Sequence, residues 1–321
     1  MSSVRLDKLA GLIEWPDDDA RSEAVQLLRS RREDPLGRLG DAAAWLAAVT
    51  GQCPPPPLRA KLLVFTDDGR VPEIAQRVAA GSGRSLHGAR ADGGATDVWD
   101  ALAAGALLAD AEADAGADLI LLAAPSEAAR IPAATLIAFV NEADAQTVAS
   151  TLRGDQEWMR TVSAVRDRLR RVKKAEEDPI SLLTALGGTE ISHLTGVILG
   201  AAARRTPVVF EGLAATAAAV MAHRITGAAG SWFMPAHPDP DPASGSGLRH
   251  MGRSALLDLG LFPGDGIAVV LAASMLDAAA AALSGDGASA SSGGETWFSD
   301  PLSQLSEPPP VDPGPGDPQP W

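Results

Sequence analysis

Three short apolar runs constrain the fold of this chain most. Residues 118–123 read Asp-Leu-Ile-Leu-Leu-Ala, and residues 61–65 and 207–210 are similar runs that end in turn signals. Such continuous runs are typical of strands buried on both faces of a parallel sheet, whereas a half-exposed strand would alternate polar and apolar residues. We expect each run to be a buried strand.

The segments between these runs have the spacing of helices. Strands that alternate with helices indicate a parallel sheet covered on both faces, so the predicted class is α/β. Residues 81–94 are rich in glycine and are interpreted as a loop, and residues 255–259 as a short strand or a helix end. The expected helices span residues 72–80, 97–115, 155–173, 180–186, 190–203, 213–224 and 267–283.

Composition divides the chain into three parts. Residues 1–53 carry leucine and tryptophan at helical spacing, and a proline run follows at residues 54–57 as a stiff connector. Residues 54–283 hold the alternating strands and helices. Residues 284–321 are rich in Gly, Ser, Pro and Asp, which bury too little apolar surface to offset chain entropy, so we expect a disordered acidic tail.

Charge and composition exclude several classes of function. The formal net charge is -14, and the one basic run, residues 166–174, is followed at once by acidic residues, so it is interpreted as a solvated helix face rather than a nucleic-acid site. The chain has no apolar run of membrane-spanning length and no apolar signal core at its N-terminus, which favours the cytoplasm. No tyrosine is present to serve as an acid or a nucleophile.

Metal and cofactor chemistry have no motif in the sequence. The five histidines lack the spacing of metal ligands, and Cys53 is the only cysteine, so no intrachain disulfide can form. The glycines at residues 81–83 are not framed by the strand and helix of a dinucleotide fingerprint. We therefore expect neither a metal nor a cofactor.

Three ordered stretches resemble one known family. Residues 178–224 contain Gly-Gly-Thr-Glu, then Arg-Thr-Pro-Val-Val-Phe-Glu-Gly and Thr-Ala-Ala-Ala, and residues 256–266 contain Leu-Asp-Leu and Gly-Asp-Gly. Residues 36–119 add Leu-Gly-Arg-Leu with Trp45, Leu-Leu-Val-Phe and Gly-Ala-Asp-Leu. Together these resemble the nicotinate-nucleotide:dimethylbenzimidazole phosphoribosyltransferases of cobalamin assembly.

The resemblance implies a fold and a reaction. The fold is a three-layer α/β/α arrangement with a parallel, Rossmann-like sheet, a small helical subdomain and assembly as a homodimer. The reaction transfers phosphoribose from nicotinate mononucleotide to a nitrogen of a benzimidazole base. The acceptor nitrogen must lose a proton to a carboxylate, and the 5′-phosphate needs N–H donors and a cation.

The resemblance assigns the general base to Asp265. The family has a glutamate between two glycines, which correspond here to Gly264 and Gly266. Aspartate is one methylene shorter, which withdraws the carboxylate by on the order of 1 Å, and a misplacement of that size can slow a reaction about 100-fold. The alternative interpretation is that residues 263–266 are a plain turn.

The phosphate loop departs from the family pattern. Residues 126–131, after the strand at residues 118–123, stand in place of the family's glycine-rich run and contain no glycine. Pro125 and Pro132 on either side each remove an N–H donor, and Glu127 adds a negative charge. Arg130 is the candidate cation for the phosphate. The alternative interpretation is that Arg130 lies on a surface turn with its side chain in solvent. A family lysine corresponds to Thr161, and its neighbour Arg160 is a candidate replacement or part of a helix face.

Two further contacts follow from the resemblance. His237 matches a family histidine at the start of a proline-rich, acidic loop, residues 237–242. Gln76 corresponds to a glutamine that lines the benzimidazole site.

Two hypotheses on function remain open: an active, divergent enzyme, or a degenerate paralogue that binds a base, a nucleotide or a partner subunit. A scaffold role for the acidic tail is a third.

Overall fold

A five-stranded parallel sheet forms the centre of the computed structural model, which describes residues 3–31, 36–174, 178–261 and 264–284. The strand order is β2-β1-β3-β4-β5, and each neighbouring pair is parallel. The carboxyl ends of all strands therefore lie at one edge. The strands are β1 (Ala60–Thr66), β2 (Ser85–Arg90), β3 (Leu119–Ala123), β4 (Val208–Glu211) and β5 (Phe233–Pro235).

The three apolar runs are the three central strands, as predicted. Every residue of β3 and β4 is buried, and so are residues 62–66 of β1. Their register sets Leu62 opposite Leu121 and Leu121 opposite Val209, which stacks branched side chains across the sheet. The continuous apolar runs arise because helices cover both faces of these strands.

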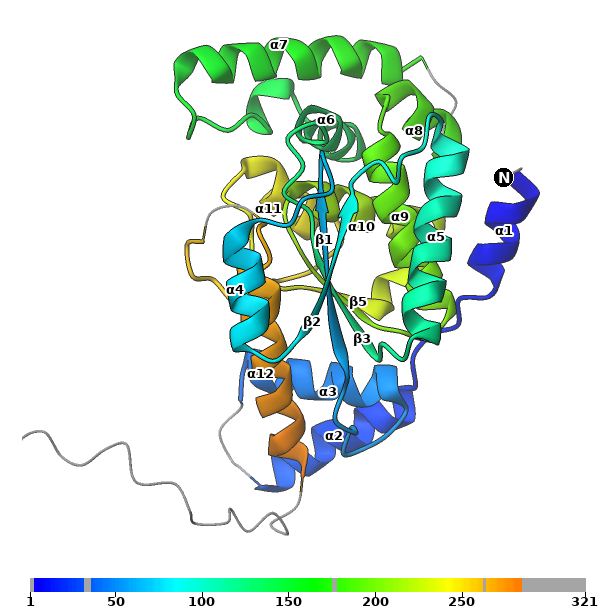
Figure 1. Cartoon of the computed structure of the whole chain (residues 1–321), viewed down its shortest axis with the longest axis vertical. Coiled ribbons are helices and arrows are strands. Elements are labelled where there is room, and N and C mark those ends of the chain that lie inside the picture. Colours follow the sequence, from blue (N-terminus) through cyan, green and yellow to red (C-terminus); the bar gives the residue numbers. More distant parts are fainter. Residues whose placement is uncertain (1–2, 32–35, 175–177, 262–263, 285–321) are drawn as a thin grey trace, which may run out of the picture. The chain divides into compact units, whose positions relative to one another are not determined.

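Helices cover both faces of the sheet. The helices α4 (Glu73–Gly81) and α12 (Ile267–Leu283) lie on one side, and α5 (Val98–Asp114) and α9 (Thr189–Ala203) lie on the other (Figure 1). This arrangement confirms the three-layer α/β/α fold. The remaining helices are α1 (Ser3–Gly11), α2 (Asp18–Arg31), α3 (Arg38–Thr50), α6 (Arg130–Val140), α7 (Asp155–Val172), α8 (Pro179–Leu186), α10 (Leu213–Ile225) and α11 (Pro242–His250), with short 3₁₀ turns at Ala145–Thr147 and Gly227–Trp232.

Glycines let α5 and α9 approach each other at backbone distance. A Cβ placed on Gly105 would lie 1.9 Å from the carbonyl oxygen of His193, and one on Gly196 would lie 2.1 Å from that of Leu102. Both distances are far below van der Waals contact, so only glycine fits this crossing. The close-packed helix pair covers one face of the sheet (Figure 1).

A small helical subdomain is built from α2, α3 and the end of α12. Trp45 of α3 is buried and donates its indole N–H to the carbonyl oxygen of Ser231 at 3.0 Å, while Arg31 of α2 donates to the carbonyl oxygen of Ala282 at 2.8 Å. Buried residues on both sides of position 53 belong to one hydrophobic core. The domain boundary at residues 53 and 54 stays a prediction, and the predicted disordered tail, apart from Ser284, lies outside the described residues.

Three local predictions were wrong. The glycine-rich stretch 81–94 contains β2, an edge strand whose residues are only partly buried, so it lacks the apolar run that marks the central strands. Residues 242–250, where the sequence indicates no helix, form α11, and Asp241 caps this helix by accepting the N–H of Ala243 at 3.2 Å. The surface turn expected around Arg130 is the start of α6. Residues 255–259 are neither strand nor helix, although the N–H groups of Leu256 and Leu257 donate to the carbonyl oxygens of Pro235, the last residue of β5, and Ala236.

Candidate active site

Three segments of the chain converge at the carboxyl edge of the sheet. These are the turn after β3, the turn after β4 and the loop before α12, represented by Pro125, Gly212 and Gly264. A Cβ placed on Gly264 would lie 3.3 Å from the Cα of Gly212 and 3.6 Å from the Cα of Pro125. Gly212 and Gly264 also have positive φ angles of 95° and 55°, which favour glycine. The backbones of the three segments are therefore in contact at the carboxyl edge of the sheet.

A cleft of about 240 Å³ opens where these segments meet. Its walls come from the start of α6, the turn after β4 and the loop before α11. A smaller hollow beside it is lined by Glu211, His237, Leu261 and Asp265 among others, and shares Gly212, Asp239 and Gly264 with the cleft. This is the position at which open parallel sheets bind their ligands.

Asp265 lies in the smaller hollow and is half-buried. Burial raises the pKa of its carboxyl group, although a weak contact of Oδ1 with the N–H of Ile267, at 3.4 Å, acts in the opposite sense. A carboxylate with a raised pKa is a better proton acceptor at neutral pH. Asp265 is therefore a half-buried carboxyl group with a raised pKa that lies beside the cleft.

Glu211, at the end of β4, holds the loop that carries Asp265. Its Oε1 accepts the N–H of Gly266, and its Oε2 accepts the N–H of Val269 at 2.8 Å. Burial, together with a smaller effect of the charge of Asp265, raises the pKa of Glu211 to about 7 against these hydrogen bonds. Sequence reasoning did not single out Glu211, although an acidic residue directly after a buried strand was a usable signal.

Two further carboxylates line the wall formed by residues 239–241. Burial raises the pKa of Asp239, and burial together with the neighbouring Asp239 raises the pKa of Asp241 to about 6. Asp239 accepts the N–H of Asp241 at 2.9 Å, which fixes this loop. The cleft therefore has an acidic wall whose charge changes near neutral pH.

Arg130 lines the cleft, but its guanidinium group is engaged. Its Nε donates to Glu127 at 2.9 Å, and another nitrogen donates to Glu157 at 2.6 Å and to the hydroxyl of Thr161 at 3.4 Å. Arg153 pairs with the other oxygen of Glu127 at 3.0 Å. An incoming phosphate would have to replace at least one of these carboxylates.

His237 is buried beside Asp265 and organises the preceding loop. Its Nε2 accepts the N–H of Leu259 at 2.8 Å and contacts the N–H of Leu261 at 3.4 Å. It lines the smaller hollow. These bonds connect the loop after β5 to the segment that leads to Gly264.

Gln76 and Arg160 do not line the cleft. Gln76 lies on α4 and is exposed, with its amide donating to the carbonyl oxygen of Val71 at 3.0 Å. Its neighbour Ala75 packs close to Gly266, so α4 supports the Asp265 loop from behind. Arg160 is exposed on α7 and forms an ion pair with Glu157 at 3.7 Å. Of the predicted residues, the structure brings together Arg130, His237, Gly264, Asp265 and Gly266.

Metal-ligating clusters and membrane-spanning helices are both absent from the described part of the chain. Among the described residues, no group of three or more His, Cys, Asp or Glu side chains is arranged to hold a metal ion. No helix among them combines the length and hydropathy needed to cross a bilayer.

Comparison with known proteins identifies the family. The model of a family described as phosphoribosyltransferase matches residues 67–293. A nicotinate-nucleotide–dimethylbenzimidazole phosphoribosyltransferase of Streptomyces avermitilis is 33% identical over 342 residues, covering 88% of this chain and 90% of the relative. The enzyme of the same name from Streptomyces coelicolor is 31% identical, covering 87% of this chain and 95% of its own length.

Solved structures agree on the fold. The crystal structure of nicotinate-nucleotide–dimethylbenzimidazole phosphoribosyltransferase from Thermus thermophilus matches with a TM-score of 0.71 at 21% identity, covering 83% of this chain and 96% of that one. The family match, the identity over most of the chain and the shared fold all agree. The chain belongs to the family of nicotinate-nucleotide–dimethylbenzimidazole phosphoribosyltransferases.

Proposed function

We propose that this protein transfers phosphoribose from nicotinate mononucleotide to a nitrogen of a benzimidazole-type base, with Asp265 as the general base. The observation that supports this most is the position of Asp265, a half-buried carboxylate with a raised pKa at the point where the three segments meet. Membership of the family supports the reaction, and this geometry supports the choice of Asp265 as the base.

The bond changes follow from the substrates. The acceptor nitrogen gives its proton to the carboxylate of Asp265 and forms a bond to C1′ of the ribose, while the bond from C1′ to the pyridine nitrogen breaks. The donor ring is cationic, so it leaves as nicotinate with a neutral ring nitrogen and needs no acid. Only one proton acceptor is required, which is consistent with a site that has carboxylates but no free cation near Asp265 in the described residues.

The 5′-phosphate is proposed to bind in the larger cleft. Arg130 and Arg153 are the cations there, with backbone N–H groups of the glycine turns beside them. Binding requires Arg130 to exchange Glu127 for the phosphate, because its guanidinium already carries two ion pairs. His237, Gly264 and Gly266 lie around the proposed base, whereas Gln76 and Arg160 lie outside both the cleft and the hollow and are not among the proposed substrate contacts.

Release of nicotinate tests the proposal. The purified protein is mixed with nicotinate mononucleotide and 5,6-dimethylbenzimidazole, and free nicotinate is measured by chromatography. Asp265→Asn should abolish release, whereas Asp265→Glu, which restores the missing methylene, should release nicotinate faster than the natural chain. Equal rates in all three proteins would exclude Asp265 as the base.

A second candidate function is ligand binding without transfer. The paired state of Arg130 and the carboxylates of Asp239 and Asp241 favour it, because they oppose a phosphate dianion. Calorimetric titration with nicotinate mononucleotide separates the two candidates. Micromolar binding with nicotinate release supports transfer, and binding of dimethylbenzimidazole alone supports the second candidate.

Assembly and location complete the proposal. We propose a homodimer in the cytoplasm. The family resemblance supports the dimer, and a single cysteine, Cys53, is compatible with a reducing compartment. Sedimentation equilibrium of the full chain measures its mass, and a monomer at micromolar concentration would exclude the dimer.

A further inference from the structure

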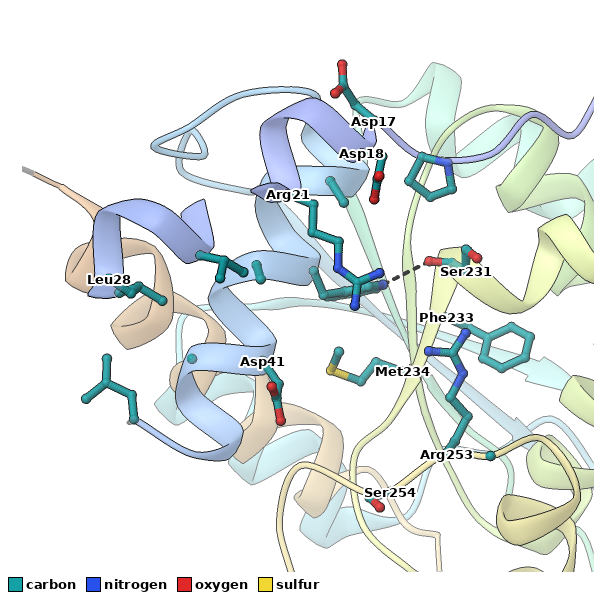
Figure 2. Close-up of a pocket in the computed structure, with 18 of the residues that line it drawn as sticks. Asp17, Asp18, Arg21, Leu28, Asp41, Ser231, Phe233, Met234, Arg253 and Ser254 are labelled. Carbon is teal, nitrogen blue, oxygen red and sulfur yellow. Dashed lines mark hydrogen bonds between the residues drawn. The ribbon is translucent and has the colours of Figure 1, made fainter. Parts of the chain in front are cut away.

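A second and larger cavity, of about 940 Å³, lies between the helical subdomain and the edge strand β5 (Figure 2). Its walls come from α2, α3, β5 and residues 252–254, and it shares no lining residue with the cleft or the hollow of the candidate active site. Small residues on one face of α3, Gly40, Ala44 and Ala48, leave the space open. The volume is within the range of pockets that bind small organic ligands.

Two guanidinium groups, Arg21 of α2 and Arg253 of the segment after α11, extend into this cavity from opposite sides (Figure 2). Among the described residues, neither forms an ion pair with a carboxylate. Arg253 donates to the carbonyl oxygen of Gly230, which fixes its position. Burial lowers the pKa of Arg253, and the charge of Arg21 lowers it further, so the two cations repel each other across the cavity.

Cations that face each other without a counter-ion are a site for an anion. Asp17 accepts the N–H of Ala20 as the cap of α2 and points away from Arg21 in Figure 2. Asp18 and Asp41 also line the cavity, and their negative charges repel an anion. The place that favours an anion is therefore between the two arginines. Guanidinium groups from two segments match a phosphate, whose oxygens accept from both, better than they match a carboxylate.

The rest of the cavity is suited to an aromatic or apolar body. Met234 of β5 and the indole of Trp45 form its inner wall, and Trp15 lies at its rim with 69% of its surface exposed. The indole N–H of Trp45 donates to the carbonyl oxygen of Ser231 at 3.0 Å, and this hydrogen bond is the dashed line that ends at Ser231 in Figure 2. A ligand that joins a phosphate to a ring would use both parts of the cavity.

We propose that this cavity binds an organic phosphate monoester, with the phosphate between Arg21 and Arg253 and the body against Trp45 and Met234. The site is separate from the proposed transferase site and does not depend on it. It gives the protein a second place to bind a phosphorylated small molecule.

Calorimetric titration of the full chain with phenyl phosphate tests this proposal, with inorganic phosphate and benzoate as comparison probes. We expect phenyl phosphate to bind more tightly than either. Arg21→Gln, an exposed position whose change leaves the fold intact, should weaken binding at least about tenfold, and Arg253→Gln should do the same. Arg224→Gln, a matched exposed arginine on α10, should leave binding unchanged.

Three outcomes would overturn the proposal. The first is no binding of phenyl phosphate at millimolar concentration and low salt, including the case in which a second copy of the chain fills the cavity. The second is binding that survives Arg21→Gln but is lost in Arg130→Gln, which would place the ligand in the cleft. The third is benzoate binding as tightly as phenyl phosphate.

Discussion

The carboxylate of Glu211, at the end of β4, accepts the N–H groups of Gly266 and Val269 and so fastens the loop of Asp265 to the sheet. Gly266 and Val269 flank the first turn of α12, so the same carboxylate also caps that helix. The proposed base is therefore positioned by a second, more deeply buried acid. The pKa of about 7 means that this connection changes its charge near neutral pH.

The pH dependence of stability should reveal this buried acid. The pKa of Glu211 is raised in the folded state from 4.5 to about 7, so its contribution is fully present below pH 4.5 and is lost as the pH rises through 7. We expect the unfolding free energy of the natural chain to fall by roughly 3 kcal/mol over this range relative to Glu211→Gln. Chemical denaturation of both proteins from pH 4 to pH 8 measures the difference, and parallel curves would contradict the assignment.

A second buried acid should have the opposite pH dependence. Burial tends to raise the pKa of Glu112, but hydrogen bonds from His87 and from Lys61, at 3.0 Å, outweigh it and lower the pKa. Its contribution is then present above its unfolded pKa of 4.5 and is lost as the pH falls through its folded pKa. Glu112→Gln should cost about 1–2 kcal/mol at pH 7 and less in acid.

The exposed ion pair of Arg77 and Glu73 provides the control for Glu112→Gln. Glu73→Gln breaks an ion pair on the surface of α4 and should change stability by no more than a few tenths of a kcal/mol. Urea unfolding at pH 7 compares the two variants. An equal loss of unfolding free energy in both variants would show that the buried ion pair of Glu112 stabilises the fold no more than an exposed one.

Charge removal at the mouth of the cleft should improve phosphate binding. Glu127 holds both Arg130 and Arg153, so Glu127→Gln frees guanidinium donors and removes one negative charge. We expect the KM for nicotinate mononucleotide to fall several-fold, with little change in kcat. Asp155→Asn, at an exposed acidic position on α7, is the control and should leave KM unchanged. A higher KM in Glu127→Gln would mean that the phosphate does not use these arginines.

The crossing of α5 and α9 should tolerate no side chain at Gly196. Its Cβ would overlap the carbonyl oxygen of Leu102, so Gly196→Ala should destabilise the fold by about 1–3 kcal/mol or more. Gly81→Ala at the end of α4, where nothing lies within 4 Å, should be neutral or slightly stabilising. Thermal unfolding compares the two, and similar melting temperatures would contradict the close packing.

The sequence predicts the centre of this fold better than its edges. Residues 61–65 and 118–123 are buried on both faces, so their apolar runs carry a clear signal. The edge strand β2 contacts one neighbouring strand and contains Gly88, where a Cβ would overlap the side chain of Val71. Its sequence therefore resembles a loop, and only tertiary packing makes it a strand.

The candidate site was predictable where it depends on strand topology. Parallel strands bring residues 124–130 and 264–266 to one edge, so the meeting of Pro125, Gly212 and Gly264 follows from the order of elements. The pairing of Arg130 with Glu157 joins residues 27 positions apart on two helices, which no local pattern indicates. The role of Glu211 depends in the same way on the return of α12 to the end of β4.

Formation of the benzimidazole ribotide itself tests the transfer reaction and the role of Asp265 together. Nicotinate mononucleotide and dimethylbenzimidazole are incubated with the natural chain and with Asp265→Asn, and the products are separated and identified by mass spectrometry. We expect one ribotide for each nicotinate released by the natural chain and none from Asp265→Asn. Nicotinate release without ribotide, or equal ribotide formation by both proteins, would contradict it.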